Sequence, residues 1–300
     1  MMKKNISICI CTFNRPKLLE KLLKSLANQY DDNLYILEII VVDNDYKMSA
    51  KEIVDNLKLD LNVRYYCEPQ RNISLARNKA VSVATGDLIA FIDDDEYPSK
   101  HWLKNLYMCY LKYGCDGVLG PVRPKYEVDP PKWIIKSKIN IRPEHLTGTI
   151  IGPQDMRTGN VLIRSDIFKK KDNYFNPKYG LIGGGDIDFF QRMIKQGYRF
   201  IWCQEAIVYE FVSKDRLTID YHLKRALARG ASRSMSESYL NISTLKSLGA
   251  VFLYFFILPL SSIVGLYFFN KYLIKLFDHL GKLIGFLGIR LVKERPYKKT

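Results

Sequence analysis

The chain has 300 residues, of which 47% are hydrophobic, and a formal net charge of +15. This length is enough for one substantial α/β domain with an appendage. Residues 211–300 hold 15 Lys and Arg against 5 Asp and Glu and are also the most apolar part of the chain. This combination favours an anionic membrane surface as partner and, without an RNA-binding signature, argues against nucleic acid.

The amino-terminal residues and the cysteines indicate a cytoplasmic environment. Residues 1–5 lead directly into an apolar segment and lack the hydrophobic core of a signal peptide. The six cysteines show neither a CxxC pair nor the spacing of metal ligands. Cys9 and Cys11 lie on one face of an apolar segment, where free thiols behave as small hydrophobic side chains. We therefore expect reduced thiols and a cytoplasmic location.

Apolar and amphipathic segments alternate over the first hundred residues. Continuous apolar runs predict buried strands, and apolar residues at helical spacing predict helices. The expected strands are 6–12, 37–42, 63–66 and 88–92, and the expected helices are 16–28, 50–57 and 74–84. Continuous apolar strands separated by helices predict a mostly parallel sheet that is covered by helices on both faces.

Polar or acidic side chains occur where three of the expected strands end. Thr12 ends the first strand, Asp43 follows the second, and four adjacent acids, from Asp93 to Glu96, follow the fourth. Ligands of parallel sheets bind at the carboxyl ends of the strands, so these groups should form one rim. Adjacent carboxylates repel one another unless a cation gathers them, and oxygen donors suit Mg²⁺ or Mn²⁺. A solvated acidic turn is the alternative. GxGxxG and Walker A motifs are absent, so no dinucleotide cofactor is expected.

The second half of the domain predicts fewer regular elements. A helix is expected at 100–113, strands at 117–122 and 158–163, and a Pro/Trp-containing loop around 130–133. The glycine-rich residues 180–185 lead into an amphipathic helix that ends near residues 195–197. Asp186 would lie near the N-terminus of this helix, where the helix dipole favours an acid. The residues alone leave an N-cap and a catalytic base equally open for Asp186.

Five motifs occur in a fixed order between residues 11 and 189. They are Cys11-Thr12-Phe13-Asn14-Arg15, Val41-Val42-Asp43-Asn44, Leu75-Ala76-Arg77-Asn78-Lys79-Ala80, Thr85-Gly86-Asp87 with Asp93-Asp94-Asp95, and Gly183-Gly184-Gly185-Asp186-Ile187-Asp188-Phe189. The ordered set resembles the family 2 glycosyltransferases, over about residues 6–211. The resemblance implies the GT-A fold, a Rossmann-like α/β architecture with a mostly parallel central sheet.

Three further segments narrow the resemblance. They are the acidic run, Gly120-Pro121-Val122 and Pro130-Pro131-Lys132-Trp133. These segments are similar to the non-processive branch of the family, which builds exopolysaccharide repeat units of the succinoglycan type. The Gln-x-x-Arg-Trp motif of processive synthases is absent, because residues 222–226 occupy the comparable region. A single-addition enzyme is therefore favoured.

The resemblance implies a site for a UDP-sugar. The residues expected to bind the nucleotide sugar are Thr12, Asn14, Arg15, Asp43, Arg77, Asp93 and Asp94. Asp43 would accept a hydrogen bond from the uracil imide, and Asp95 with Asp93 would bind Mn²⁺ or Mg²⁺ at the diphosphate, where the metal neutralises charge on the leaving group. Strand alternation would turn Asp94 and Glu96 to the opposite face, which favours a structural role for Asp94.

The resemblance also implies the chemistry of transfer. Asp186 would act as the general base that removes the proton of the acceptor hydroxyl during in-line attack on the anomeric carbon. Such a displacement inverts the configuration, so an α-linked nucleotide sugar gives a β-glycoside. Members of the family usually carry Glu-Asp where this chain has Gly185-Asp186. Because the missing Glu would contact the acceptor, the resemblance implies less about the acceptor than about the donor.

A further set of residues is expected to contact the acceptor or a diphosphate. The set is Trp133, Asn160, Asp188, His222, Arg225 and Arg229. Trp133 lies in a proline-flanked loop, where it would either stack on a sugar or pack the loop. His222, Arg225, Arg229 and Arg233 recur at helical spacing across residues 220–233. They form either a solvated basic face or a face that binds a diphosphate or lipid pyrophosphate, and we favour the second.

The carboxyl-terminal residues carry the membrane signal. Residues 247–270 contain no charge, a length that permits one membrane span, and Pro259 lies near their centre. Residues 272–291 are amphipathic, which suits the membrane interface. Basic residues flank the uncharged stretch on both sides, including four after position 292. The positive-inside rule therefore predicts a hairpin bent near Pro259, or two passes, over a single crossing. A buried helical hairpin of a soluble protein is the alternative.

The sequence thus predicts three regions: a catalytic domain at 1–211, a basic helical connector at 212–246 and a membrane-associated region at 247–300. The expected reaction transfers a single sugar from a UDP-sugar to a saccharide, expected to be linked to polyprenyl diphosphate, at the cytoplasmic face of the membrane. A processive polysaccharide synthase is disfavoured by the few membrane segments. A sugar nucleotidyltransferase would need a glycine-rich phosphate loop near its start. A non-enzymatic membrane adaptor would not bind UDP with Mn²⁺.

Overall fold

The computed structural model describes residues 3–29, 33–235 and 241–289. Its main sheet has seven strands in the order β3-β2-β1-β4-β8-β6-β9. These are β1 (Lys4–Thr12), β2 (Tyr35–Asp43), β3 (Val63–Cys67), β4 (Leu88–Ile92), β6 (Gly117–Leu119), β8 (Asn160–Arg164) and β9 (Phe200–Trp202). β8 runs antiparallel to its neighbours β4 and β6, and the other pairs are parallel. The expected α/β fold with a mostly parallel sheet is confirmed.

Helices cover both faces of this sheet. α1 (Pro16–Ala27) and α4 (Trp102–Tyr113) pack on one face, and α3 (Ile73–Val83) and α6 (Gly185–Lys195) pack on the other. Within β1, Ile8 and Ile10 belong to the first core and Cys9 belongs to the second. Both faces of the strand are therefore buried, which explains its continuous apolar sequence.

The strand predicted at 117–122 is confirmed as β6 over 117–119, but it ends earlier than predicted, because the chain leaves the main sheet at Gly120 and Pro121. β7 (Val122–Tyr126) instead joins a second sheet of order β5-β10-β7, with β5 (Glu96–Pro98) and β10 (Val208–Val212). Proline has no backbone N–H to donate to a strand ladder, so Pro121 suits a position between two sheets. The second sheet places β10 beside the acidic run, where the Phe211 N–H donates to the Asp95 carbonyl at 2.7 Å.

Short helices complete the domain. α2 (Lys51–Asp55) follows β2, and α5 (Lys132–Ser137) forms where a loop was expected. The 3₁₀ helices are η1 (Ser165–Lys169), η2 (Lys171–Asn173), η3 (Pro177–Tyr179) and η4 (Lys214–Leu217).

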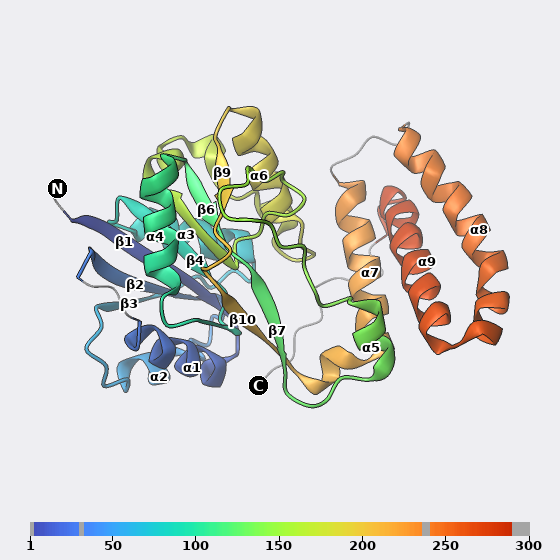
Figure 1. Ribbon diagram of the computed structural model, residues 1–300, viewed down its shortest axis with the longest axis horizontal. Coiled ribbons are helices and arrows are strands. Elements are labelled where there is room, and N and C mark those ends of the chain that lie inside the picture. Colours follow the sequence, from blue (N-terminus) through green and yellow to red (C-terminus); the bar gives the residue numbers. More distant parts are fainter. Residues whose placement is uncertain (1–2, 30–32, 236–240, 290–300) are drawn as a thin grey trace.

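Three long helices form a layer beside the domain. α7 (Ile219–Ser234), α9 (Leu266–Phe286) and α8 (Ile242–Val264) lie side by side, with α9 in the middle and α8 outermost (Figure 1). The chain reverses at Gly265, whose φ of 136° is accessible to glycine at no steric cost. The bend expected near Pro259 is wrong, because Pro259 lies inside a continuous α8. Among the described residues, α8 is the one helix long and apolar enough to cross a membrane. Residues 290 and 291 of the expected amphipathic segment, and the basic residues after 292, lie outside the described residues.

Candidate active site

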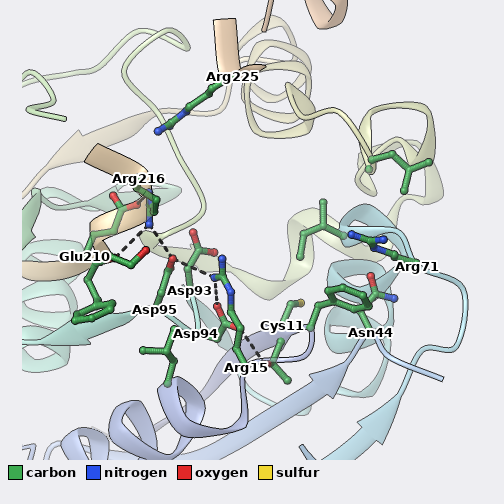
Figure 2. A pocket seen from close by; sticks show the side chains of 18 of the residues that line it. Cys11, Arg15, Asn44, Arg71, Asp93, Asp94, Asp95, Glu210, Arg216 and Arg225 are labelled. Atoms are coloured by element: carbon green, nitrogen blue, oxygen red, sulfur yellow. Dashed lines mark hydrogen bonds and ion pairs between the residues drawn. The ribbon is translucent and has the colours of Figure 1, made fainter. Parts of the chain in front are cut away.

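A cavity of about 190 Å³ opens at the carboxyl ends of the strands, between the main sheet and α7. Its lining includes six arginines and five acidic side chains. The arginines are Arg15, Arg71, Arg77, Arg142, Arg216 and Arg225, and the acids are Asp93, Asp94, Asp95, Glu210 and Asp215. Figure 2 shows Arg225 reaching toward the cavity from the side opposite Arg15 and Asp94. Thr12 and the three aspartates therefore meet at one rim, as expected from the strand ends, and residues from far along the chain close it.

Arg15 and Arg216 bind two of the three aspartates. Arg15 Nη1 lies 2.9 Å from Asp94 Oδ1 and 3.1 Å from Asp95 Oδ2. Arg216 Nη1 lies 3.2 Å from the same Asp95 oxygen (Figure 2). Thr12 Oγ1 donates to Asp94 Oδ2 at 2.8 Å. Two guanidinium groups therefore pair with Asp95, the carboxylate that is expected to bind a metal.

The expectation that Asp94 faces away from its neighbours is wrong. β4 ends at Ile92, and the aspartates lie in a turn closed by a hydrogen bond from the Glu96 N–H to the Asp93 carbonyl, at 3.0 Å. Strand alternation does not extend into such a turn, so Asp94 and Asp95 share Arg15. Glu96 is buried, and its Oε2 accepts from the Asp93 N–H at 3.0 Å. Burial raises the pKa of Glu96 well above its usual range, which favours the neutral form.

Arg77 joins the acidic turn to Asp186. Its Nη1 lies 2.7 Å from Asp186 Oδ1, and its Nη2 lies 3.6 Å from Asp93 Oδ1. Thr158 Oγ1 donates to the same Asp186 oxygen at 3.0 Å. The N-cap of α6 is Gly184, with a φ of 95°, and Asp186 lies inside the first turn of the helix. The N-cap interpretation of Asp186 is therefore wrong, and its role as a base stays a prediction.

Asp93 lies in a strongly charged environment. Although 46% of its side chain is exposed, desolvation by the pocket raises its pKa to about 6. Arg77 opposes this shift, while Asp95 and Asp186 add to it. The carboxylates thus repel one another, as expected for groups that gather around a cation.

The structure contradicts the expected contact between Asp43 and uracil. The Asp43 side chain is completely buried and accepts hydrogen bonds from the N–H groups of Asp45 (3.1 Å) and Ala50 (2.7 Å) and from the Tyr65 hydroxyl (2.9 Å). These bonds hold the turn after β2. The next residue, Asn44, lines the cavity and accepts a hydrogen bond from the Asn72 N–H at 2.8 Å.

Asn14 acts through its backbone. It has a φ of 55°, a left-handed conformation that asparagine tolerates better than most residues. The residue lies between β1 and α1 and is not among the residues that line the cavity. Its turn directs the next residue, Arg15, toward the acids.

Two residues expected to bind the acceptor are engaged elsewhere. Asn160 is 2% exposed; its Oδ1 accepts from the Trp102 indole at 2.8 Å, and its Nδ2 donates to the carbonyls of Pro121 and Ala206. Asp188 pairs with Arg192, one turn later on α6, at 3.0 Å, and does not line the cavity. The expected acceptor contact of Asn160 is wrong, because all its polar atoms serve the core.

The basic residues of α7 have different surroundings. Arg225 lines the cavity, and its contact with a diphosphate stays a prediction. Arg229 Nε lies 2.7 Å from Asp278 of α9, and Arg233 pairs with the same carboxylate. The expected diphosphate contact of Arg229 is therefore wrong, since its guanidinium group holds α9 instead.

His222 and Trp133 support the base of α7. Their ring centroids lie 5.6 Å apart in an edge-to-face arrangement, and His222 is 3% exposed. Burial, together with Arg225 and Arg216, lowers the pKa of His222 to about 4. Trp133 also packs against the cluster of Ile134, Val212 and Leu217. His222 is therefore a neutral buried residue and not an anion ligand, and Trp133 packs α5 against the base of α7.

Several cavity residues have no signal in the sequence. Glu210 accepts from Arg142 Nη2 at 2.9 Å and pairs with Arg216. Burial raises the pKa of Glu210, but Arg142 and Arg216 outweigh this effect and lower it to about 2. Arg71 stacks on the Phe13 ring, 4.3 Å from its centroid. These charged residues lie outside the sequence motifs, and nothing in the sequence indicates which partner each of them contacts after folding.

The donor set fits a divalent cation shared with a ligand. Within the described residues, no group of three or more His, Cys, Asp or Glu side chains could hold a metal ion. Mg²⁺ commonly uses one or two carboxylates and takes its remaining oxygens from water and substrate phosphates. Asp95 and Asp93 meet this requirement in the presence of a diphosphate, and they do not form a protein cage by themselves.

The chain is similar to several characterised proteins. Residues 7–170 match the family model described as glycosyl transferase family 2. The succinoglycan biosynthesis protein ExoM of Rhizobium meliloti is 35% identical over 231 residues, which cover 75% of this chain and 73% of the relative. The GalNAc(5)-diNAcBac-PP-undecaprenol beta-1,3-glucosyltransferase of Campylobacter jejuni is 37% identical over 98 residues, 30% of this chain and 29% of the relative. The crystal structure of S. aureus TarS 1-349 in complex with UDP-GlcNAc has a similar fold, with a TM-score of 0.54, 18% identity and coverage of 96% and 92% of the two chains.

Proposed function

Because the chain belongs to glycosyl transferase family 2 and is a glycosyltransferase, we propose that it transfers one sugar from a UDP-sugar to a hydroxyl group of a lipid-linked saccharide. The similarity to TarS, whose structure contains UDP-GlcNAc, supports a UDP-sugar donor. The Campylobacter relative, named for an undecaprenol diphosphate acceptor, supports an acceptor linked to polyprenyl diphosphate. The relative in succinoglycan biosynthesis supports a role in surface polysaccharide synthesis. We place this reaction at the cytoplasmic face of the membrane, as expected from the sequence.

The observation that carries this proposal is the cavity at the strand ends, which six arginines line together with the acidic turn. A diphosphate needs cationic donors, and guanidinium groups bind phosphate oxygens in a bidentate manner. Arg15 and Arg216 already lie beside Asp95, so they can bind phosphate oxygens when the ligand enters. Asp95 and Asp93 would hold Mn²⁺ or Mg²⁺, which when bound neutralises charge on the departing diphosphate.

Asp186 would be the base for the transfer. Hydrogen bonds from Arg77 and Thr158 fix the orientation of its carboxylate beside the acidic turn. The acceptor oxygen attacks the anomeric carbon, its proton passes to Asp186, and UDP leaves from the opposite side with the electron pair of the broken bond. This geometry inverts the anomeric configuration.

The test is a donor screen with the full chain. Nucleotide sugars are incubated with a lipid-linked oligosaccharide extract in the presence of Mn²⁺, Mg²⁺ or EDTA, and the released nucleotide and the product mass are measured. We expect UDP release that requires both metal and lipid acceptor, and a product that gains one sugar. Release from a GDP- or CMP-sugar, or activity that survives EDTA, would contradict the proposal. A ladder of added sugars would identify a processive synthase instead.

A further inference from the structure

One side of α8 is a continuous apolar stripe. Its residues follow each other at intervals of three or four, so they lie on one face of the helix. They are Leu245, Leu248, Phe252, Phe256, Leu260 and Ile263, and the exposed fraction of each is above half, from 53% at Leu248 to 84% at Ile263. The helix has no charged residue after Lys246. Exposed apolar surface of this extent marks a site that binds a membrane or another protein.

The opposite side of α8 packs on α9 along its length. Near the first turn of α8, Lys282 Nζ donates to Ser243 Oγ. One turn later, His279 Nδ1 lies 3.1 Å from the Ser247 hydroxyl oxygen. Further along, the Tyr254 ring lies 5.9 Å from the His279 ring and 5.8 Å from the Tyr272 ring. The two helices are therefore antiparallel neighbours as far as the turn at Gly265.

α9 in turn is held tightly by α7. A methyl group at Gly281 would collide with the Leu227 carbonyl of α7, and one at Gly230 would collide with the Asp278 carbonyl of α9. Small residues at such positions let two helix backbones touch. The ion pairs from Arg229 and Arg233 to Asp278 cross the same interface. Because Arg225 of α7 lines the cavity, the whole layer is continuous with the active site.

This packing conflicts with a membrane crossing by α8. If α8 stood across a bilayer, α9 would lie at the same depth with four charged residues, namely Lys271, Lys275, Asp278 and Lys282. A charged side chain near the centre of a bilayer costs about 3 kcal/mol on insertion scales. If α8 crossed alone, the contacts with α9 would be lost. A helix that lies flat on the surface avoids both costs.

We propose that α8 lies in the plane of an anionic lipid leaflet and inserts its apolar stripe without crossing the bilayer. This inference rests on the proposed action at a membrane and specifies how the chain is attached. α8 has 23 residues and would extend about 35 Å along the surface, with its stripe reaching roughly 5–10 Å into the leaflet. Residues 211–300 hold 15 Lys and Arg against 5 Asp and Glu, so they attract anionic headgroups. The same charge repels a second copy of this region.

The first experiment measures co-flotation of the full chain with phosphatidylglycerol-containing vesicles. The double variant Phe252→Ser/Phe256→Ser removes two aromatic anchors from the stripe. The control, Leu146→Ser/Ile150→Ser, removes two side chains that are 82% and 64% exposed but lie outside α8 and α9. We expect binding to fall at least tenfold in the stripe variant and to stay at the parent level in the control. Equal binding by both variants would overturn the proposal.

The second experiment measures the depth of α8. Tryptophan replaces Leu245, Phe256 or Ile263 in turn, and quenching by lipids brominated at shallow or deep positions is compared with the parent protein. A helix in the plane predicts strong shallow quenching at all three positions. Deep quenching at Phe256→Trp with weak quenching at both ends would show a crossing and overturn the proposal. A lipid-free dimer that the stripe variant dissociates, without vesicle binding by the parent, would assign the stripe to a second copy.

UDP binding by the same preparations, with Mn²⁺ present, separates this inference from the proposed function. Intact UDP binding together with absent or crossing-type membrane contact would overturn the in-plane inference alone. Shallow, uniform quenching without UDP binding or sugar transfer would overturn the proposed function and leave the membrane arrangement supported.

Discussion

Arg77 binds Asp93 and Asp186 with one guanidinium group, so a single side chain joins the donor side of the cavity to the expected base. Asparagine at position 186 has the size of aspartate and can still accept a hydrogen bond from Arg77, but it cannot take up a proton. We expect Asp186→Asn to lower the rate of sugar transfer about 10²–10⁴-fold, the range that general base catalysis supplies. UDP affinity, measured by calorimetry, should change little.

The matched control for this change is Asp55→Asn. Asp55 forms an exposed ion pair with Lys51, and its side chain is 53% exposed. The control should transfer sugar at the parent rate. Near-normal transfer by Asp186→Asn would remove Asp186 from the mechanism, and a parallel loss of UDP affinity would show that the residue supports donor binding instead.

His222 gives the stability of the chain a defined pH dependence. Its pKa is lowered from 6.5 to about 4 in the folded protein, so between these values the unfolded chain binds the proton more tightly. The contribution of His222 is complete above pH 6.5 and is lost as the pH falls toward 4. Between pH 7 and pH 5 the free energy of unfolding should fall by about 2 kcal/mol on account of this residue.

The measurement compares urea unfolding of the parent and of His222→Gln at pH 7 and pH 5. Glutamine does not titrate, so the variant should lose about 2 kcal/mol less between the two pH values. His101→Gln, at an exposed position, is the control and should behave as the parent. An equal pH dependence in parent and His222→Gln would mean that His222 is protonated in the folded state.

The helices α7 and α9 are in close backbone contact at Gly281. A methyl group at Gly281 would meet the Leu227 carbonyl, whereas one at Gly249 of α8 would meet open space. We expect Gly281→Ala to lower the free energy of unfolding by about 1–3 kcal/mol, because overpacking forces the two backbones apart. Gly249→Ala should raise it by roughly 0.5–1 kcal/mol, because alanine favours the helix. Thermal unfolding of the two variants measures both, and equal shifts would disprove close contact at Gly281.

Elements with a strong local pattern could be predicted from the sequence. The strand expected at 88–92 has the bounds of β4, and the helix expected from Pro16 begins there. The strand-end argument also placed Thr12 and Asp93 at one site, because parallel strands end at the same edge, and the family resemblance added Arg77 from its helix. These inferences depend on neighbours in sequence and on one rule of sheet topology.

Partners that are distant in sequence could not be predicted. Asn160 begins the apolar strand β8 and looks available in the sequence, yet its side-chain oxygen accepts a hydrogen bond from Trp102, which lies 58 residues away. Arg216 reaches Asp95 across 121 residues, after β10 has paired with β5. Periodicity carries no information about such pairs, and the side-chain roles assigned from motifs failed where the partner came from another element.

At the scale of the whole molecule, α7 is the part shared by the active site and the helical layer. One face holds α9 through Arg229 and Arg233. Toward the domain, Ser232 Oγ donates to the Gly183 carbonyl at 2.6 Å, in the turn that precedes Asp186. Gly184 in the same turn has a φ of 95°, and a methyl group there would collide with the Ser232 hydroxyl. The position of the expected base therefore depends on how α7 is seated.

Ser232→Ala tests this dependence. Loss of one buried hydrogen bond costs about 1 kcal/mol. If this loss misplaces Asp186 and raises the activation free energy of transfer by a similar amount, kcat should fall roughly threefold to tenfold. The KM for the UDP-sugar should change little, because the donor cavity is lined by other residues. Ser234→Ala is the control, since its hydroxyl donates to the Ala231 carbonyl of its own helix at 2.8 Å. An equal change in kcat for both variants, or a change confined to KM, would show that Ser232 does not position Asp186.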